Sequence, residues 1–287
     1  MIKVWHIVYL ITDLDVGGAE NSLYQLVTHL NPKKISPVVC SLSGEGKIAE
    51  KLREKGIEVI CLGAKNKLDI TIFFKLLKLL HHKKLHIIHT YLFHANFIGR
   101  IAGRIAGIPI VISSVRTMEK QKRHHVYLDM LTCWMVDKEV CVSKEVAKFV
   151  RKYAKVPTHK LITIYNGIDC DNLSITKNIE DKKKELSIDQ FNPIIGTVGH
   201  LTIAKGINYL LKAFKLILKD FPNACLLIVG SGYQEKKLKK LALELNITPS
   251  VKFLGFREDA IDIMNIMDVF VLPSLWEGMP NVILEAY

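Results

Sequence analysis

Short apolar runs alternate with amphipathic segments from one end of the chain to the other. The runs that predict strands cover residues 4–11, 36–42, 57–62, 85–89, 108–113, 139–142, 161–165, 194–199, 224–229, 251–254 and 269–272. Several runs are apolar at nearly every position, which is typical of parallel strands that are buried on both faces. Strands that alternate with helical patterns predict an α/β protein with doubly wound parallel sheets.

A polar stretch divides the series of strands. Residues 170–190 are charged and show no periodicity, so we expect a linker with at most a short helix. Just before it, Asn166-Gly167-Ile168-Asp169 predicts a tight turn. We therefore expect a first domain over residues 1–169, a linker over 170–190 and a second domain over 191–287.

Composition and charge limit the class of protein. The chain has 287 residues with 49% hydrophobic content, enough for two domains with a core each. The first apolar run leads into Asp13 and Asp15 without a cleavage site, which favours a buried strand over a signal peptide. A run long enough to span a membrane is not present in the sequence.

The formal net charge of +12 indicates an anionic partner, which could be nucleic acid, an acidic lipid surface or a phosphorylated substrate. Nucleic acid is not expected, because zinc, RNP-like and paired basic-helix patterns are absent from the sequence. The six cysteines form no C-x-x-C pair and mostly lie in or beside apolar runs. We read them as core residues in a reducing cytosol and expect no metal site.

Residues 69–84 predict a basic amphipathic helix, in which lysines such as Lys75 and Lys78 alternate with large apolar side chains. Such a helix can lie on an anionic bilayer with its apolar side chains inserted and its lysines at the headgroups. It can also pack on a sheet with a solvated basic face, and this is the interpretation that we favour. The sequence leaves both interpretations open.

The last loop carries two carboxylates. Glu277 follows the apolar run 269–272, and Glu285 lies eight residues later, beyond Pro280, in what reads as the start of a helix. A loop after a parallel strand lies at the edge of an open α/β sheet where ligands bind. The segment E-G-x-P-x-x-x-x-E resembles the donor-sugar signature of the retaining family-four glycosyltransferases, which have the GT-B fold of two Rossmann-like domains facing a cleft.

The resemblance implies a donor site in the second domain. Family members have G-R-L-x-x-x-K-G after the first strand of this domain, where the arginine and lysine hold the donor diphosphate. This chain has Gly199, His200, Lys205 and Gly206 there, so a histidine replaces the arginine. A neutral histidine supplies less charge than arginine, which implies a weaker or pH-dependent grip. By the same resemblance Glu277 with Gly278 addresses the donor sugar, and Glu285 binds the ribose hydroxyls.

Two further segments extend the resemblance over the whole chain. Gly17-Gly18-Ala19-Glu20 is similar to the first phosphate-facing loop of the family, although paired glycines also serve simple chain reversal. The loop Thr90–Asn96 is similar to the acceptor-side loop, in which His94 is the expected active-site histidine and Tyr91 stands where many relatives have one. Arg116 follows a strand at the ligand edge and either binds an acceptor anion or is solvated. A basic patch is expected after it, at Lys120, Lys122, Arg123, His124 and His125.

The resemblance implies an enzyme that moves a hexose from a nucleotide-diphosphate sugar to a lipid-linked or polysaccharide acceptor with retention of configuration. His94, Lys205 and Glu277 are the implied catalytic residues, no metal or other cofactor is expected, and the implied location is cytoplasmic or peripheral on the inner membrane face. The sugar, the base and the acceptor are not specified by the sequence.

Two alternatives remain open at this point. One is a non-catalytic protein that binds nucleotide sugar or docks on a complex, and the other is an epimerase or phosphorylase of the same architecture. The chain stops soon after Glu285, where family members continue for roughly another 80 to 100 residues. We therefore expect a truncated second domain with an unpaired sheet edge and apolar surface exposed beside the donor site.

Overall fold

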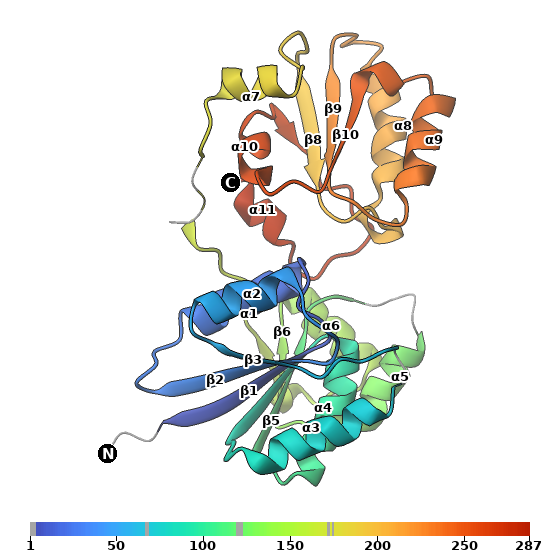
Figure 1. Ribbon diagram of the computed structural model, residues 1–287. Helices are drawn as coiled ribbons and strands as arrows, with labels where there is room; N and C mark the ends of the chain where they lie inside the picture. Colours follow the sequence, from blue (N-terminus) through green and yellow to red (C-terminus); the bar gives the residue numbers. More distant parts are fainter. Residues whose placement is uncertain (1–3, 67–68, 119–122, 171–172, 174) are drawn as a thin grey trace. The chain divides into compact units, whose positions relative to one another are not determined.

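The computed structural model describes residues 4–66, 69–118, 123–170, 173 and 175–287 (Figure 1). The chain divides into two compact units, Met1–Gly167 and Ile168–Tyr287. Each unit is built on a parallel sheet with helices on its faces, so the predicted α/β class is confirmed.

The first unit contains a seven-stranded sheet with the order β3-β2-β1-β4-β5-β6-β7. Its strands are β1 (Trp5–Ile11), β2 (Ile35–Ser41), β3 (Glu58–Cys61), β4 (Ile87–Tyr91), β5 (Ile110–Val115), β6 (Lys138–Cys141) and β7 (Leu161–Thr163). The strand order reverses between β1 and β4, where Ile11 pairs with Tyr91 at the carboxyl ends. This is the topological switch point at which open α/β sheets bind ligands.

Helices cover both faces of this sheet: α1 (Gly18–Thr28), α2 (Lys47–Glu54), α3 (Thr71–His82), α4 (Phe93–Ile105), α5 (Arg123–Thr132) and α6 (Lys144–Tyr153). The alternation of side chains along β1 explains the two cores. Val8 and Leu10 pack in one cluster with α3 and α4, whereas Ile7, Tyr9 and Ile11 pack in another with α1 and α2. Ser143 caps α6, because its Oγ accepts a hydrogen bond of 3.3 Å from Val146 N.

The second unit contains four parallel strands in the order β10-β9-β8-β11. They are β8 (Ile194–Val198), β9 (Cys225–Val229), β10 (Val251–Gly255) and β11 (Val269–Phe270). The helices are α7 (Ile179–Glu185), α8 (Ile207–Ile217), α9 (Glu235–Glu244), α10 (Ala260–Asn265) and α11 (Asn281–Glu285). Apolar side chains of α8 and α9 cover one face of the sheet, and those of α10 cover the other. The described part of this unit thus has the four strands that the sequence predicts, with β11 at one edge.

The segment predicted as a linker is structured in its second half and packs on the second unit. Thr176 N and Oγ1 donate to the two carboxylate oxygens of Asp262 at 2.7 and 2.5 Å. The ammonium of Lys182 in α7 donates to Asp259 Oδ2 at 2.6 Å, and the lysine is only 1% exposed. Hydrogen bonds and ion pairs to carboxylates that are distant in the sequence help to hold this segment in place. The pattern of apolar residues therefore does not show that the segment is structured.

Candidate functional site

A glycine in the left-handed conformation forms the turn at the carboxyl edge of the second sheet. After β8 the chain makes a short 3-10 turn, Ile203–Lys205, and Gly206 follows with φ 62° before α8 begins. A Cβ at Gly206 would lie 2.2 Å from the carbonyl oxygen of Pro273. Leu275 N also donates to Ala204 O at 2.8 Å. The loop after β8 and the loop after β11 are therefore in direct contact.

This contact brings two of the expected donor-site residues together. Lys205 Nζ lies 2.6 Å from Glu277 Oε1, and both side chains are about a quarter exposed. The hydroxyl of Ser274 donates to the same carboxylate oxygen at 2.7 Å. Because β8 and β11 are neighbouring strands, residues that are far apart in the sequence meet at one edge. Ser274 was not anticipated from the sequence.

The glycines after β8 and β9 allow the two loops to touch. A Cβ at Gly230 would lie 2.0 Å from the carbonyl oxygen of Gly199, and one at Gly232 would lie 2.5 Å from that of Leu201. Leu201 N donates to Ser231 O at 2.9 Å. Close packing of backbone on backbone thus accounts for glycine at positions 230 and 232.

The other expected donor residues are close to Lys205 or Glu277 in the sequence, but their structural surroundings differ from one residue to the next. Gly199 allows the Lys205 side chain to pass close by, since a Cβ there would be 3.5 Å from Lys205 Cε. His200 is exposed at the end of β8. Gly206 N donates to Ile203 O at 3.2 Å, so its N–H is already used within the turn. Gly278 lies in the loop before α11.

Glu285 is the fifth and last residue of α11, which begins at Asn281 directly after Pro280. Burial raises the pKa of its carboxyl. The predicted helix after Pro280 is confirmed.

In the first unit, Gly17 is the N-cap of α1 and Gly18 is its first residue. A Cβ at Gly17 would lie 2.2 Å from Glu20 Oε2, whereas one at Gly18 would meet nothing within 4 Å. The Glu20 carboxyl thus folds back over Gly17 and is only 7% exposed. Burial, with smaller contributions from Asp13 and Asp15, raises the pKa of Glu20 to about 7, although Arg116 opposes the shift. The sequence signal for Glu20 was its place in G-G-A-E, but its burial could not be predicted.

Arg116 lies directly after β5 and is held by neighbours in its own unit. Its guanidinium lies 5.9 Å from the centre of the Tyr91 ring, and its Nη2 donates to Asn166 Oδ1. Burial lowers the pKa of Arg116. Asn166 belongs to the predicted turn, so that turn also positions an arginine.

The expected place of Tyr91 in the loop after the strand is wrong, because Tyr91 is the last residue of β4 and is only 3% exposed. Burial raises the pKa of its hydroxyl to about 12. The neighbouring His89 is held neutral, since burial lowers its pKa to about 3, and its Nε2 lies 2.8 Å from Ser114 Oγ.

The expected place of His94 in a loop is also wrong. The chain turns at Leu92, which has φ 69°, and α4 begins at Phe93, so His94 lies in the first helical turn. Its ring contacts Phe93 edge-on at 5.2 Å. His125, which was expected in a basic patch, is buried and stacks flat on Phe93 with 3.5 Å between ring centres. Lys120 and Lys122 of that patch lie outside the described residues.

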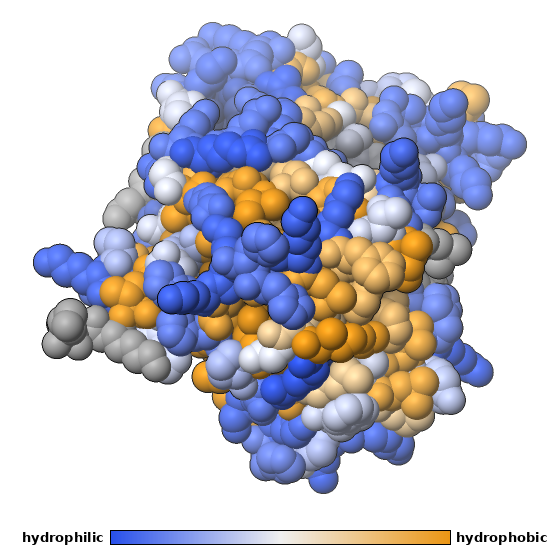
Figure 2. Space-filling view, turned by 60° about the horizontal axis from the view of Figure 1, so that its bottom comes forward, coloured by the Kyte–Doolittle hydropathy of each residue, from blue (hydrophilic) through white to orange (hydrophobic). Residues whose placement is uncertain are grey.

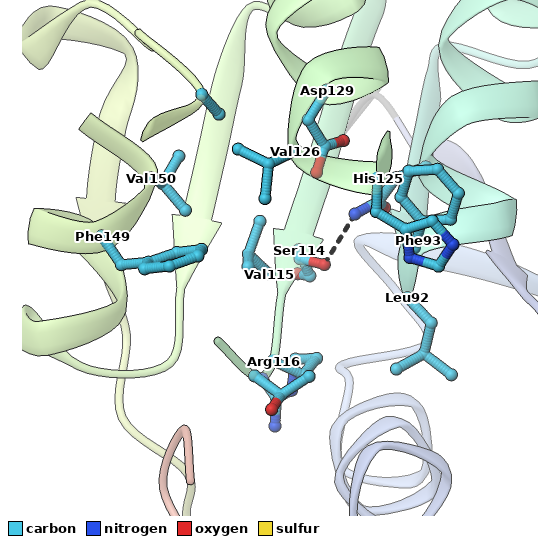
Figure 3. A pocket seen from close by; sticks show the side chains of 13 residues that line it. Leu92, Phe93, Ser114, Val115, Arg116, His125, Val126, Asp129, Phe149 and Val150 are labelled. Carbon is cyan, nitrogen blue, oxygen red and sulfur yellow. Dashed lines mark hydrogen bonds between the residues drawn. The ribbon is translucent and has the colours of Figure 1, made fainter. Parts of the chain in front are cut away.

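A pocket of about 50 Å³ lies beside these rings in the first unit. Figure 3 shows Phe149, Val150 and Val126 on one side of it and Phe93 with His125 on the other. Asn96 Nδ2 donates to the Ser114 carbonyl at 3.0 Å along its wall. Arg116 also lines it, whereas His94 does not. The sequence did not predict this pocket, because its walls come from three separate helices and a strand.

Two negative findings concern the described residues. Among them, His, Cys, Asp and Glu side chains form no group of three that could hold a metal ion. No helix in the described part of the chain combines the length and the apolar character needed to cross a membrane.

Comparison with known proteins gives consistent matches over both units. Residues 16–172 match the family described as Glycosyltransferase Family 4, and residues 178–287 match Glycosyl transferases group 1. The UDP-Gal:alpha-D-GlcNAc-diphosphoundecaprenol alpha-1,3-galactosyltransferase of Escherichia coli is 31% identical over 262 residues, which cover 87% of this chain and 68% of that protein. The capsular polysaccharide biosynthesis glycosyltransferase CapH of Staphylococcus aureus is 26% identical and matches 100% of this chain and 79% of its own length.

Among solved structures, that of HepE from Anabaena in complex with UDP and glucose superposes with a TM-score of 0.86 at 21% identity. The match covers 98% of this chain and 78% of that protein. At this identity the likeness concerns the fold, and it confirms the predicted GT-B class. The chain belongs to the family-four glycosyltransferases, with a Glycosyltransferase Family 4 domain followed by a group 1 glycosyltransferase domain.

Proposed function

We propose that the protein transfers a hexose from a nucleotide-diphosphate sugar to a lipid-linked or polysaccharide acceptor with retention of configuration and without a metal. The observation that carries the proposal is the Lys205–Glu277 ion pair at the ligand edge of the second sheet, in a chain that belongs to this family. The relatives whose names specify a diphosphoundecaprenol acceptor or capsular polysaccharide support the acceptor class.

The chemistry requires a cation at the donor phosphates. When the bond from the anomeric carbon to the diphosphate breaks, negative charge grows on the leaving group, and a fixed ammonium stabilises it. Lys205 is the proposed source of that charge. In the free protein, Glu277 neutralises it at 2.6 Å. Binding of the diphosphate replaces the carboxylate, and Glu277 then becomes available to the hydroxyls of the donor sugar.

Further residues are proposed to bind the donor or the acceptor. Glu285 is proposed to bind the ribose hydroxyls, and Gly17 with Gly18 to let the first-unit backbone approach the phosphates. Arg116 is proposed to bind an anionic group of the acceptor, because its guanidinium lines the pocket of the first unit and lies 5.9 Å from the centre of the Tyr91 ring. His94 is proposed to act on the acceptor side from the first turn of α4.

The experiment that tests the function measures nucleotide release from a panel of nucleotide-diphosphate sugars, with and without a diphospholipid-linked sugar acceptor. We expect nucleotide diphosphate to be released only when acceptor is present, and the anomeric proton of the product to report retention by NMR. Interconversion of the sugar without acceptor would instead indicate an epimerase. Binding of nucleotide sugar without turnover would favour the non-catalytic interpretation.

A matched pair of variants assigns the activity to the proposed site. Lys205→Ala should lower kcat/KM by about a hundred-fold or more, as loss of a transition-state donor does in other enzymes. Lys212→Ala, on the exposed face of α8, removes a lysine from the same unit and should leave turnover unchanged. Equal rates for both variants would refute the assignment of Lys205.

The proposed location is the cytoplasmic side of the membrane that contains the acceptor lipid. A lipid-linked acceptor is confined to the bilayer, so an enzyme that uses it works at the membrane surface.

A further inference from the structure

The pocket of the first unit has two apolar walls. More than half of its lining residues are apolar, among them Phe93, Val115, Val126, Phe149 and Val150. Phe93 and the His125 ring that stacks on it form one wall, and Val126, Phe149 and Val150 form the opposite one (Figure 3). Hydroxyl groups placed against such walls would lose their hydrogen bonds to water without replacement. The interior is therefore suited to an occupant with an apolar part.

Apolar side chains alone do not distinguish this place in the molecule. Figure 2 shows apolar and hydrophilic side chains intermixed on the outer surface, which is ordinary for a folded protein. The pocket differs from that surface because a buried polar side chain also lines it. Asn96, in the first turns of α4, is 2% exposed and belongs to the pocket wall.

Asn96 offers a hydrogen-bond donor whose position is fixed. Its Oδ1 accepts a hydrogen bond of 2.7 Å from Thr90 Oγ1, and its Nδ2 donates to the carbonyl oxygen of Ser114 at 3.0 Å. The amide nitrogen carries two hydrogens, and in the part of the chain that the structure describes the second one has no acceptor. Because buried donors are nearly always paired, this hydrogen indicates a ligand that brings an acceptor oxygen.

The volume of the pocket limits that ligand to a small group. About 10 to 15 Å³ holds one water-sized group, so about 50 Å³ holds roughly four heavy atoms. The group should also be neutral, because the carboxylate of Asp129, paired with Arg100 at 2.9 Å, lines the pocket and disfavours a second anion. An acetamido group consists of a nitrogen, a carbonyl carbon, its oxygen and a methyl group. It therefore has the required size and charge, an apolar part, and an acceptor for the Asn96 hydrogen.

The cation at the end of the pocket indicates where the acetamido group is attached. Figure 3 shows Arg116 beyond Ser114 and Val115, at the end away from Val126. The proposed function gives Arg116 an anionic group of the acceptor, and the present inference rests on that proposal. In a sugar with a phosphate on C1 and an acetamido group on C2, the two groups are on neighbouring carbons. An anion at Arg116 is thus compatible with an acetamido group inside the pocket.

We propose that the pocket between α4, α5 and α6 is a subsite for the acetamido group of the acceptor, which is a 2-acetamido sugar with its diphosphate on C1. The amide carbonyl accepts the second Asn96 hydrogen, and the methyl group packs against the apolar walls. A buried network holds the donor in place, since Thr90 Oγ1 lies 3.0 Å from Ser113 Oγ, which accepts from Arg100 Nε at 2.9 Å. The subsite selects the acceptor and takes no part in the bond that is made.

The test measures binding of N-acetylglucosamine 1-phosphate and glucose 1-phosphate by NMR titration. The two compounds differ only at C2. The acetamido compound should bind about ten-fold more tightly, because burial of one methyl group and one amide hydrogen bond each contribute several-fold. Saturation transferred from the protein should be greatest at the acetyl methyl protons. Neither readout needs turnover, so failure of the subsite and failure of the proposed transferase activity are distinguishable.

Two variants change the size of the pocket in opposite directions. Val126→Phe fills it and should lower the affinity for the acetamido compound about ten-fold, with the affinity for glucose 1-phosphate unchanged. Phe149→Ala enlarges it and should raise the affinity for the N-butanoyl analogue several-fold, a gain that a misfolded protein cannot give. Leu131→Phe is the matched control, because it adds the same ring at a position of α5 that is 48% exposed and does not line the pocket. It should keep the preference of the unmodified protein.

Three outcomes would overturn the proposal. The first is equal affinity of the unmodified protein for the two sugar phosphates, or no binding of either. The second is a Val126→Phe protein that keeps the preference, since the acetamido group would then bind elsewhere. The third is a Phe149→Ala protein that binds the N-butanoyl analogue no better than the unmodified protein does, since the pocket would then not set the size of the acyl group.

Discussion

The backbone of Gly206 approaches the carbonyl of Pro273 so closely that a methyl group on its α-carbon would lie 2.2 Å from the oxygen. Gly206 follows Lys205, and Pro273 lies four residues before Glu277. The contact therefore fixes the separation of the two loops that carry the ion pair. A backbone contact, which side-chain chemistry alone does not reveal, sets the geometry of the proposed donor site.

Gly206→Ala should consequently destabilise the second unit and weaken nucleotide binding together. Two penalties combine, since alanine is strained at φ 62° and its Cβ collides with rigid backbone. We expect a loss of about 2 to 4 kcal/mol in the free energy of unfolding, measured with urea.

Gly255→Ala tests the backbone strain alone, without a collision of the new Cβ. Gly255 also has a positive φ, 69°, but a Cβ there meets nothing within 4 Å. This control should cost only about 1 kcal/mol and leave nucleotide affinity unchanged. Equal losses for the two variants would show that the contact with Pro273 is not important.

Glu277→Gln should separate nucleotide affinity from turnover. In the free protein Glu277 neutralises Lys205 and also accepts a hydrogen bond from Ser274. Without the carboxylate charge, the ammonium has no anionic competitor, so the affinity for the nucleoside diphosphate of the donor, measured by calorimetry, should stay equal or rise. Turnover should fall by about ten-fold or more, because the proposed contact with the donor sugar is weakened.

Ser274→Ala should have a smaller effect than Glu277→Gln. It removes one hydrogen bond to Glu277 and leaves both charges in place, so a loss of a few-fold in turnover is expected. A parallel fall of nucleotide affinity and turnover in Glu277→Gln would contradict the exchange of partners at Lys205.

Glu20 should make the stability of the first unit depend on pH. Burial raises its folded-state pKa from 4.5 to about 7. A raised carboxyl pKa means that the protonated form is favoured by folding, so this contribution is complete below pH 4.5 and is lost as pH rises through 7. Between pH 5 and pH 8 the free energy of unfolding should fall by up to about 3 kcal/mol more in the unmodified protein than in Glu20→Gln.

Urea unfolding of both proteins at the two pH values measures this difference. Glu50→Gln, at an exposed position of α2, is the control and should follow the unmodified protein. A Glu20→Gln variant that also follows it would show that Glu20 ionises normally in the folded state.

The strands were predictable from the sequence, whereas the surroundings of individual side chains were not. The runs 194–199 and 224–229 are apolar because the strands β8 and β9 are buried on both faces, and this signal is local. The start of α4 depends on the left-handed turn at Leu92, a residue type that gives no such signal. Without that turn, the segment up to Asn96 looked like a loop, and His94 was misplaced.

The residues of the candidate site likewise differ in whether the sequence predicts them. Lys205 and Glu277 could be named from the motifs that contain them, and their meeting at 2.6 Å follows from the pairing of β8 with β11. Ser274 and the buried Glu20 could not be named, because their roles depend on contacts between loops.

The segment 175–190 gives the last prediction, because an ionic network holds its helix α7 in addition to the buried Ile188. Lys182 is 1% exposed and bonds to Asp259 at 2.6 Å and to Glu185 at 3.1 Å. Removing Asp259 leaves the buried ammonium with the more distant Glu185 alone, whereas replacing the lysine by an apolar group of similar shape leaves no buried charge. Asp259→Ala should therefore cost about 3 kcal/mol, and Lys182→Met clearly less.

Hydrogen exchange of the α7 amides distinguishes the two variants, since local opening of this helix is the expected consequence. Asp259→Ala should accelerate exchange in α7 far more than Lys182→Met does. The network should also weaken at low pH, because Lys177, Lys182 and Arg257 lower the pKa of Glu185 to about 2. A lowered carboxyl pKa gives stability that is present above the unfolded value near 4.5 and is lost as pH falls through about 2. Faster α7 exchange in Lys182→Met than in Asp259→Ala would contradict this prediction. It would mean that the ion pairs of the Lys182 ammonium stabilise the segment by more free energy than burial of its charge costs.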